Sequence, residues 1–319
     1  MQRKNRKKEV SMEVRERYIN FYTDYAFKKL FGTAANKDLL MDFLNALFDG
    51  KECITDLTYL NTEQLGVAET ARKAFFDVYC TNTRGEHFIV EMQRYAQEYF
   101  IDRTLYYTSF AINQQGQKGE WNYCLEKVYV VSILNFVFDN SNPEHYRHDV
   151  MLMDTHTKEI FYNKQLLVYL EMPKFTKKEE ELETQFEKWM YAIAHLCQLE
   201  GRPAALSGEI FTRFFEQAEV LKFTPEERKN YILSRKQLWD EHSVWEYQWK
   251  QGLEQGREEG EAIGLEIGLQ QGREEGEHEK ALAIARQMQT RGIPLETILE
   301  CTGLSAEELK AVFATSVRE

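Results

Sequence analysis

The chain has 319 residues, of which 43% are hydrophobic and 29% are charged. This composition excludes a largely disordered chain and supplies enough apolar surface for a core. The formal charge of −12 disfavours a nonspecific coat on nucleic acid. The longest apolar runs, such as VYVVSILNFVF, are shorter than the roughly 20 residues of a membrane span, so we expect no membrane partner.

Short sequence signals exclude several other kinds of protein. The basic residues 1–17 lack the apolar segment of a secretory signal, so we interpret them as a solvated tail rather than an arm that contacts phosphate. The five cysteines are scattered without paired spacing, which is typical of a reducing compartment and predicts a cytoplasmic protein. Neither glycine-rich phosphate-binding motif occurs in the sequence.

Hydrophobic spacing predicts the elements of the first half. Helical spacing is clear at Phe27, Leu30 and Phe31, and a continuous run of valine, isoleucine and phenylalanine is typical of a strand buried on both faces. The predicted elements are one or two helices over 18–50 that stop at Gly50, a strand within 53–63, a hairpin of 71–82 and 86–93, a helix over 98–120, and a central strand over 125–138.

The second half continues with strands and then becomes helical. Strands are predicted over 148–155 and 166–175, and helices follow from 177 to 249. Helices on both sides of the strand segments indicate an α/β fold, with a mixed sheet flanked by helices and then a C-terminal helical lobe and tail.

A glycine recurs at every fourth position from Gly252 to Gly276, within an acidic segment at 251–280. Each glycine costs a helix roughly 1 kcal/mol relative to alanine, so an isolated helix is unfavourable. Two interpretations stay open. One is a flexible acidic spacer; the other is a helix that forms on pairing with a second copy, which predicts a homo-oligomer.

The last segment has the spacing of a helix-turn-helix hairpin. Gly303 lies at the predicted turn, and Ser305 and Glu308 have the spacing of a capping box for the second helix. Such a unit can enter the major groove of DNA. Its only cation on the second helix is Lys310, which favours a packing or dimerisation hairpin over DNA readout.

Two acids lie on the predicted hairpin. Asp77 is in the first strand, and Glu91 is near the end of the second, so the hairpin brings them together at one end of a sheet. Two close, partly buried carboxylates need compensation, and a divalent cation with hard oxygen ligands supplies it. The alternative for each acid alone is exposure to solvent or an ion pair with Arg72 or Arg94.

Several blocks of the sequence resemble one known family. The blocks FYTDYAFKKLFG, KAFFDVYCTNTRGEHFIVEMQ and VYVVSILNFVF occur in the order found in PD-(D/E)XK nuclease family transposases, which are relatives of bacterial Rpn-type recombination-promoting nucleases. The resemblance spans residues 18–189, and the glycine repeat and TGLSAEELKAV also resemble tails of that family.

The resemblance implies a restriction-endonuclease-like core that cuts DNA with Mg²⁺ or Mn²⁺. Asp77 matches the central acid, Glu91 matches the acid of (D/E)XK, and Gln93 stands where that motif usually has lysine. The implied catalytic residues are Asp77, Glu91, Gln93 and Asp24, with Asp77 and Glu91 as metal ligands and with Arg103 and Tyr107 as contacts to substrate phosphate.

Two functions therefore follow for the chain. The first is a Mg²⁺-dependent DNA endonuclease that promotes recombination or belongs to a mobile element. The second is a weakly active or inactive nuclease-fold protein that binds DNA or assembles into oligomers, which the net acidity and Gln93 favour. The predicted segments are a tail (1–17), a nuclease-like core (18–175), a helical lobe (176–250), the glycine repeat (251–280) and the terminal hairpin (281–319).

Overall fold

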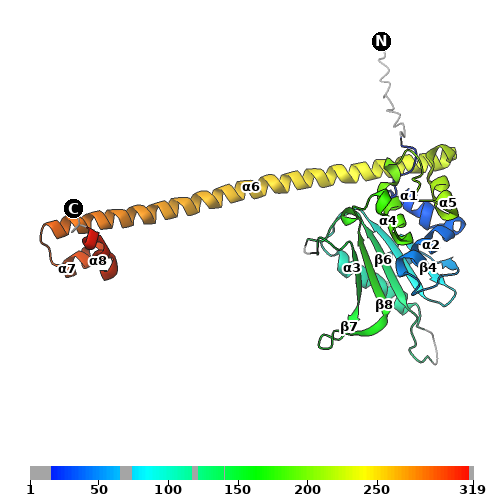
Figure 1. Cartoon of the computed structure of the whole chain (residues 1–319), viewed down its shortest axis with the longest axis horizontal. Helices are drawn as coiled ribbons and strands as arrows, with labels where there is room; N and C mark the ends of the chain where they lie inside the picture. The colour runs from blue at the N-terminus through cyan, green and yellow to red at the C-terminus, as the bar shows by residue number, and fades with distance from the viewer. Residues whose placement is uncertain (1–15, 65–73, 117–120, 140, 316–319) are drawn as a thin grey trace, which may run out of the picture. The chain divides into compact units, whose positions relative to one another are not determined.

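The computed structural model describes residues 16–64, 74–116, 121–139 and 141–315 (Figure 1). The chain divides into two compact units, Met1–Trp239 and Asp240–Glu319. All but the last two residues of the predicted basic tail lie outside the described residues.

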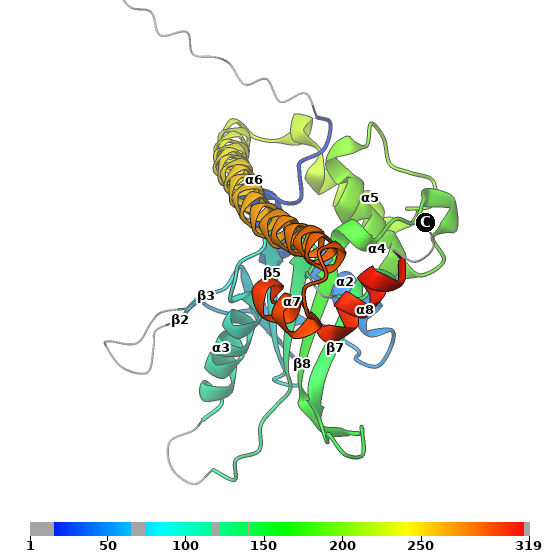
Figure 2. The same cartoon turned by 90° about the vertical axis from the view of Figure 1, so that its left-hand side faces the viewer.

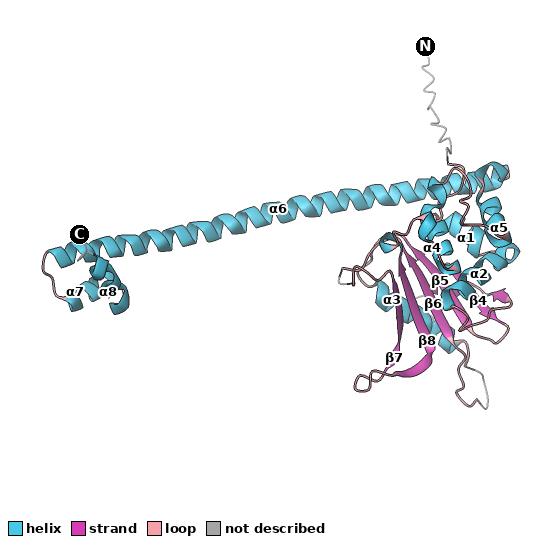
Figure 3. Cartoon of the chain, in the orientation of Figure 1, coloured by secondary structure: helices cyan, strands magenta, loops and turns pink. Residues whose placement is uncertain are grey.

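A six-stranded mixed sheet forms the centre of the first unit (Figure 3). Its strands are β1 (Leu57–Tyr59), β4 (Val78–Asn82), β5 (His87–Gln93), β6 (Val128–Leu134), β8 (Ile160–Glu171) and β7 (Arg147–Met153), in that spatial order. The β5–β6 and β6–β8 pairs are parallel, and the other pairs are antiparallel. All residues of β6 are buried, which confirms the predicted central strand.

The predicted single strand over 71–82 is wrong in one respect. The structure has β3 (Ala74–Phe75) and β4 as separate strands, and β3 pairs with β2 (Glu63–Gln64) outside the main sheet. The break falls at Phe76 and Asp77. At this break, the Asp77 N–H donates to the Glu91 side chain, and the Asp77 carboxylate accepts from the Met92 N–H of β5. These two side-chain hydrogen bonds replace the regular backbone ladder between the strands.

The two faces of the sheet are covered by different helices. Residues of β5 alternate between the faces, so Phe88, Val90 and Met92 pack in a larger core with helices α1, α2, α4 and α5, whereas Ile89 packs in a smaller core beneath α3. These helices are α1 (Asp24–Phe31), α2 (Lys37–Phe48), α3 (Phe100–Asn113), α4 (Gln185–His195) and α5 (Glu209–Ala218). Figure 2 shows α3 on one side of the sheet and α4 and α5 on the other.

The helical segment 18–50 forms two helices because each has its own end signals. The Thr23 hydroxyl accepts a hydrogen bond from the Ala26 N–H at the start of α1. Helix α2 ends at Phe48, and Gly50 follows with a φ of 72°. The predicted stop at Gly50 is therefore confirmed to within two residues.

A single helix, α6 (Pro225–Thr290), begins in the first unit and continues in the second. In the first unit the buried Tyr231 accepts a hydrogen bond from the Asn20 N–H at 2.9 Å. The glycine repeat is helical and exposed, and ion pairs one turn apart, such as Arg257 with Glu261 at 2.9 Å, support it. The repeat is therefore helical, and its pairing with a second copy stays a prediction.

The second unit ends in a small helical core. Helix α7 (Leu295–Thr302) and helix α8 (Ala306–Thr315) pack on the end of α6 through Ala285, Ile298 and Leu309. Gly303 has a φ of 68°, and the Ser305 N–H donates to Glu308 Oε2 at 2.7 Å. The predicted turn and the predicted cap are both confirmed. Across the described ranges, none of the helices combines the length and apolar character that crossing a bilayer requires.

Candidate active site

The two acids of the hairpin meet at one end of the sheet. Val78 of β4 pairs with Val90 of β5, so the register brings Asp77 opposite Glu91. The Asp77 N–H donates to Glu91 Oε1 at 3.0 Å, and the Met92 N–H donates to Asp77 Oδ2 at 2.9 Å. Each carboxylate therefore accepts a backbone N–H from the segment that carries the other acid, and the two carboxylates lie next to each other.

Burial and mutual repulsion act on this pair. Glu91 is only 5% exposed, and burial followed by the charge of Asp77 raises its pKa well above the ordinary value. Burial also raises the pKa of Asp77, although the Met92 N–H and the charges of Lys28 and Arg103 oppose that rise. The folded chain therefore stores electrostatic repulsion at the place where the resemblance implies a cation.

Asp24 lies near the pair but is bound to another residue. It is the first residue of α1, and its Oδ1 lies 2.8 Å from Lys28 Nζ. The negative charge of Asp24 contributes to the raised pKa of Asp77. Lys28 was not among the residues predicted from the sequence, yet its charge acts on both hairpin acids. The available signal was its position one turn after Asp24 on the same helix.

Gln93 and Arg103 form a second connection at the site. The Arg103 guanidinium donates to Gln93 Oε1 and to Gln97 Oε1, each at 2.6 Å. Gln93 Nε2 donates to the Tyr95 carbonyl at 3.1 Å. Both ends of the Gln93 amide are thus engaged by protein atoms. Through its oxygen, Gln93 positions a guanidinium whose charge acts on Asp77 and Glu91.

Tyr107 lies one turn beyond Arg103 on α3, and both predicted phosphate contacts are beside the acids. The Tyr107 ring packs against Phe76 at 5.0 Å, and the Arg103 guanidinium lies 5.7 Å from the Tyr107 ring centre. Burial, followed by the charge of Glu91, raises the pKa of Tyr107. Arg72, which the sequence left as a partner for an acid, lies outside the described residues.

The site offers two carboxylates to a divalent cation. Within the described ranges there is no cluster of three or more histidine, cysteine or acidic side chains suited to hold a metal. Two carboxylates with several water molecules suit Mg²⁺, which keeps much of its hydration shell. Two buried polar atoms near Glu91 also lack a partner, Arg103 Nε and the Oγ of Ser132, which pairs with Glu91 in the β5–β6 register. Water carried by a hydrated ion is a suitable partner for such atoms.

A charged cavity adjoins Asp77. This lysine pocket has a volume of about 730 Å³, and its wall includes Lys28, Lys29, Asp77 and Glu227. Lys29 pairs with Glu227 and Lys28 pairs with Asp24, and the charge of Lys28 also acts on both hairpin acids. The wall therefore carries two lysines and two carboxylates.

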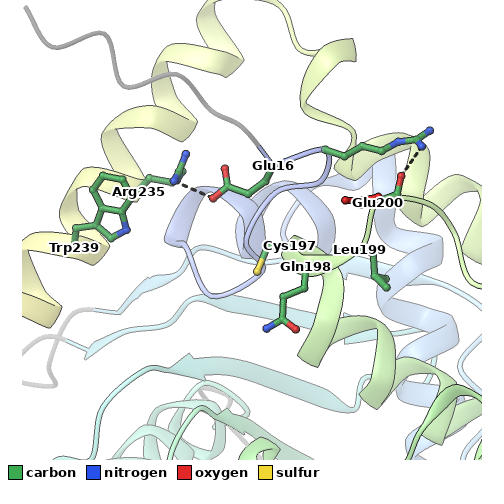
Figure 4. Close-up of a pocket in the computed structure, with 8 residues that line it drawn as sticks. Glu16, Cys197, Gln198, Leu199, Glu200, Arg235 and Trp239 are labelled. Carbon is green, nitrogen blue, oxygen red and sulfur yellow. Dashed lines mark hydrogen bonds and ion pairs between the residues drawn. The ribbon is translucent and has the colours of Figure 1, made fainter.

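A different cavity lies away from the acids (Figure 4). Its volume is about 580 Å³, and its wall includes Glu16, Cys197 and Trp239. The Arg235 guanidinium lies 2.9 Å from Glu16 Oε1 and 4.9 Å from the ring centre of Trp239. Because neither hairpin acid lines it, this cavity is not part of the candidate site.

The fold and the interlocked acids define a class of protein, the restriction-endonuclease-like nuclease core. More particularly, the chain belongs to the PD-(D/E)XK nuclease family transposases, whose family model matches residues 21–248. Residues 278–314 match the C-terminal HTH domain of the Rpn/YhgA-like nuclease family. Both matches confirm the predicted family, and the first extends through the helical lobe. No match was found among curated proteins or among solved structures.

Proposed function

We propose that the chain is a metal-dependent DNA endonuclease that hydrolyses phosphodiester bonds. One observation carries this proposal: Asp77 and Glu91 are fixed at one place by reciprocal hydrogen bonds although both acids are buried enough to raise their pKa values. A buried pair of like charges destabilises the fold, and such pairs are typical of functional sites. In this family, hydrolysis of a nucleic-acid backbone is that function.

In this proposal Asp77 and Glu91 hold Mg²⁺ or Mn²⁺. When bound, such an ion polarises a phosphoryl oxygen and lowers the pKa of a coordinated water. Lys28 and Arg103 attract the phosphodiester from opposite sides of the acid pair, because one lies on α1 and the other on α3. Asp24 holds Lys28 in place, and Gln93 holds Arg103, so the motif's usual lysine charge comes from a neighbouring helix.

The direct test is nicking of supercoiled plasmid by the purified full chain in Mg²⁺ and in Mn²⁺. We expect cleavage by the wild type and its loss in Asp77→Ala and Glu91→Ala. Glu144→Ala is a matched control, because Glu144 is an exposed acid outside the site. Intact plasmid in every reaction, from protein that is folded by circular dichroism, would count against the endonuclease.

The second candidate is a nuclease-fold protein that binds DNA without cutting it. The engaged amide of Gln93 and the net charge of −12 favour this alternative. It requires DNA binding that is unchanged by EDTA, together with absence of cleavage. A gel shift with and without chelator separates the two candidates.

We further propose that the terminal HTH domain contributes to DNA binding and that the helical glycine repeat mediates association of two copies. The domain match supports the first role. The second rests on the seven exposed glycines at four-residue spacing, none of which has an atom near its missing Cβ position. A link to recombination or to a mobile element, and a cytoplasmic location, remain predictions from the resemblance and from the cysteine pattern.

A further inference from the structure

An aromatic cavity lies on the α3 side of the acid pair. Its volume is about 780 Å³, within the range of about 300–1,000 Å³ that is usual for ligand sites. We call it the aromatic pocket; it is lined by Phe75 of β3 and by Gln97, Glu98, Tyr99, Asp102, Arg103, Tyr106 and Tyr107. Phe75 is 59% exposed and Tyr99 is 66% exposed, so large rings line a cavity that is open to solvent.

Two residues of the aromatic pocket connect it to the candidate active site. Phe75 lies two positions before Asp77 in the chain. Arg103 lines the pocket and also donates to Gln93, two positions after Glu91. The lysine pocket contains Asp77 in its wall. The acid pair is therefore flanked by the lysine pocket and by the aromatic pocket.

The two acids of the pocket wall disfavour a phosphate inside the pocket. Glu98 and Asp102 supply these carboxylates, whereas the one guanidinium of the wall, Arg103, is directed to Gln93 beside the acid pair and to Gln97. An anion would be repelled by Glu98 and Asp102. A flat, neutral ligand with N–H groups suits the same wall, because its faces stack on rings and its N–H groups donate to carboxylates.

Helical spacing presents the rings in a row. Tyr99 lies at the N-cap of α3, and Tyr106 follows two turns later, with Asp102 between them on the same side of the helix. Phe75 comes from a separate strand and supplies another wall. Rings from two elements around one space form a stacking platform of the kind that binds bases of single-stranded nucleic acid.

We propose that the aromatic pocket holds an unpaired nucleobase of the DNA strand whose phosphate lies at Asp77 and Glu91. The preferred substrate is then single-stranded or locally unpaired DNA, because the bases of an intact duplex are stacked inside the helix. This inference rests on the proposed endonuclease function and names its substrate class.

The test measures binding of the full chain in EDTA, so that no cleavage occurs. Fluorescence anisotropy compares three labelled oligonucleotides of equal length: a single strand, a perfect duplex and a duplex with a central unpaired bubble. We expect the single strand and the bubble to bind more tightly than the duplex. Tyr99→Ala and Phe75→Ala should each weaken binding of the single strand by about tenfold, since loss of one stacked base contact costs roughly 1–3 kcal/mol, and should leave duplex binding unchanged.

Two control variants isolate the stacking contact. Tyr99→Phe keeps the ring and removes the hydroxyl, so binding of the single strand should be retained. Phe161→Ala removes a ring that is 82% exposed on β8, outside the pocket, and should change nothing. Both Tyr99 and Phe75 are exposed, so their replacement by alanine does not open a cavity in the core.

The outcomes separate this inference from the proposed function. Equal affinity for single strand and duplex, or alanine variants that bind single strands as the wild type does, overturns the base pocket even if plasmid is nicked. A change of oligomeric state in those variants without a change in DNA binding also overturns it, because the pocket then holds another protein segment. Selective binding of unpaired DNA without any nicking would instead overturn only the endonuclease.

Discussion

Glu91 is the residue at which burial and repulsion are strongest. A carboxyl with a raised pKa in the folded state takes up protons that the unfolded state does not hold, so the free energy of unfolding falls as pH rises from the ordinary pKa of glutamate through the raised one. We expect Glu91→Gln, in EDTA, to raise the melting temperature near pH 7, by roughly 2–4 °C for each kcal/mol of repulsion removed.

The pH series supplies the control for this expectation. Below the ordinary pKa of glutamate both states are protonated, so wild type and variant should melt alike there. The glutamine oxygen can still accept from the Asp77 N–H, so the hydrogen bond is kept. A variant that is less stable than the wild type at every pH would mean that the acid is structural and that its charge is not repelled.

Arg103 takes the part of the lysine that the motif lacks. Arg103→Ala should reduce nicking by about 100-fold, the usual effect of removing one preorganised donor. Gln93→Lys introduced into that variant should restore part of the rate, because it puts a cation on the strand next to Glu91. Initial rates for the two variants check this, and failure of the double variant to exceed Arg103→Ala, with both proteins folded, would refute the role.

At the same scale, the acids were predictable and their partners were not. The proximity of Asp77 and Glu91 was predictable from strand alternation and from the short turn between their strands, because these two features fix the register of the hairpin. Lys28 and Arg103 come from helices, and the angle at which a helix lies over a sheet has no comparably local signal. The engaged state of Gln93 depends on Arg103 and was missed for that reason.

Element boundaries followed the strength of the local pattern. Strand β6 was predictable because its sequence is continuously apolar, and helices α4 and α5 were predictable because their apolar residues repeat at helical spacing. The break between β3 and β4 was not, because it is made by side-chain bonds to another strand. In α6 the glycine cost pointed away from an isolated helix, but ion pairs such as Arg273 with Glu277 at 2.9 Å oppose that cost.

Alanine substitutions in the glycine repeat of α6 should raise the stability of the helix and lower its self-association. Gly264→Ala with Gly268→Ala should stabilise the helix by up to roughly 1 kcal/mol per site, because both positions are exposed and helical. If two copies pack along this stripe, the added methyl groups should also weaken self-association. Circular dichroism measures the first effect, and light scattering measures the second. Unchanged mass with raised helicity would remove the proposed oligomer role of the repeat.

At the scale of the whole molecule, the two units have separate tasks in the proposed function. The first unit contains the acid pair and both flanking pockets, and the second contains the HTH domain. The charge of −12 opposes DNA binding at long range, so local cations must compensate for it near the site. The order of helices and strands indicated a mixed sheet flanked by helices, and the resemblance implied the nuclease fold. The division of the chain after Trp239 falls inside a continuous helix and has no breaker residue to mark it.

The claim that Asp77 and Glu91 together hold a divalent cation is tested most directly by titrating Mn²⁺ into the full chain, without DNA, and following bound Mn²⁺ by electron paramagnetic resonance. We predict a site in the wild type and in Glu144→Ala that is lost in Asp77→Ala and in Glu91→Ala. Equal Mn²⁺ binding by the wild type and both site variants, or no binding by any of them, would contradict the account.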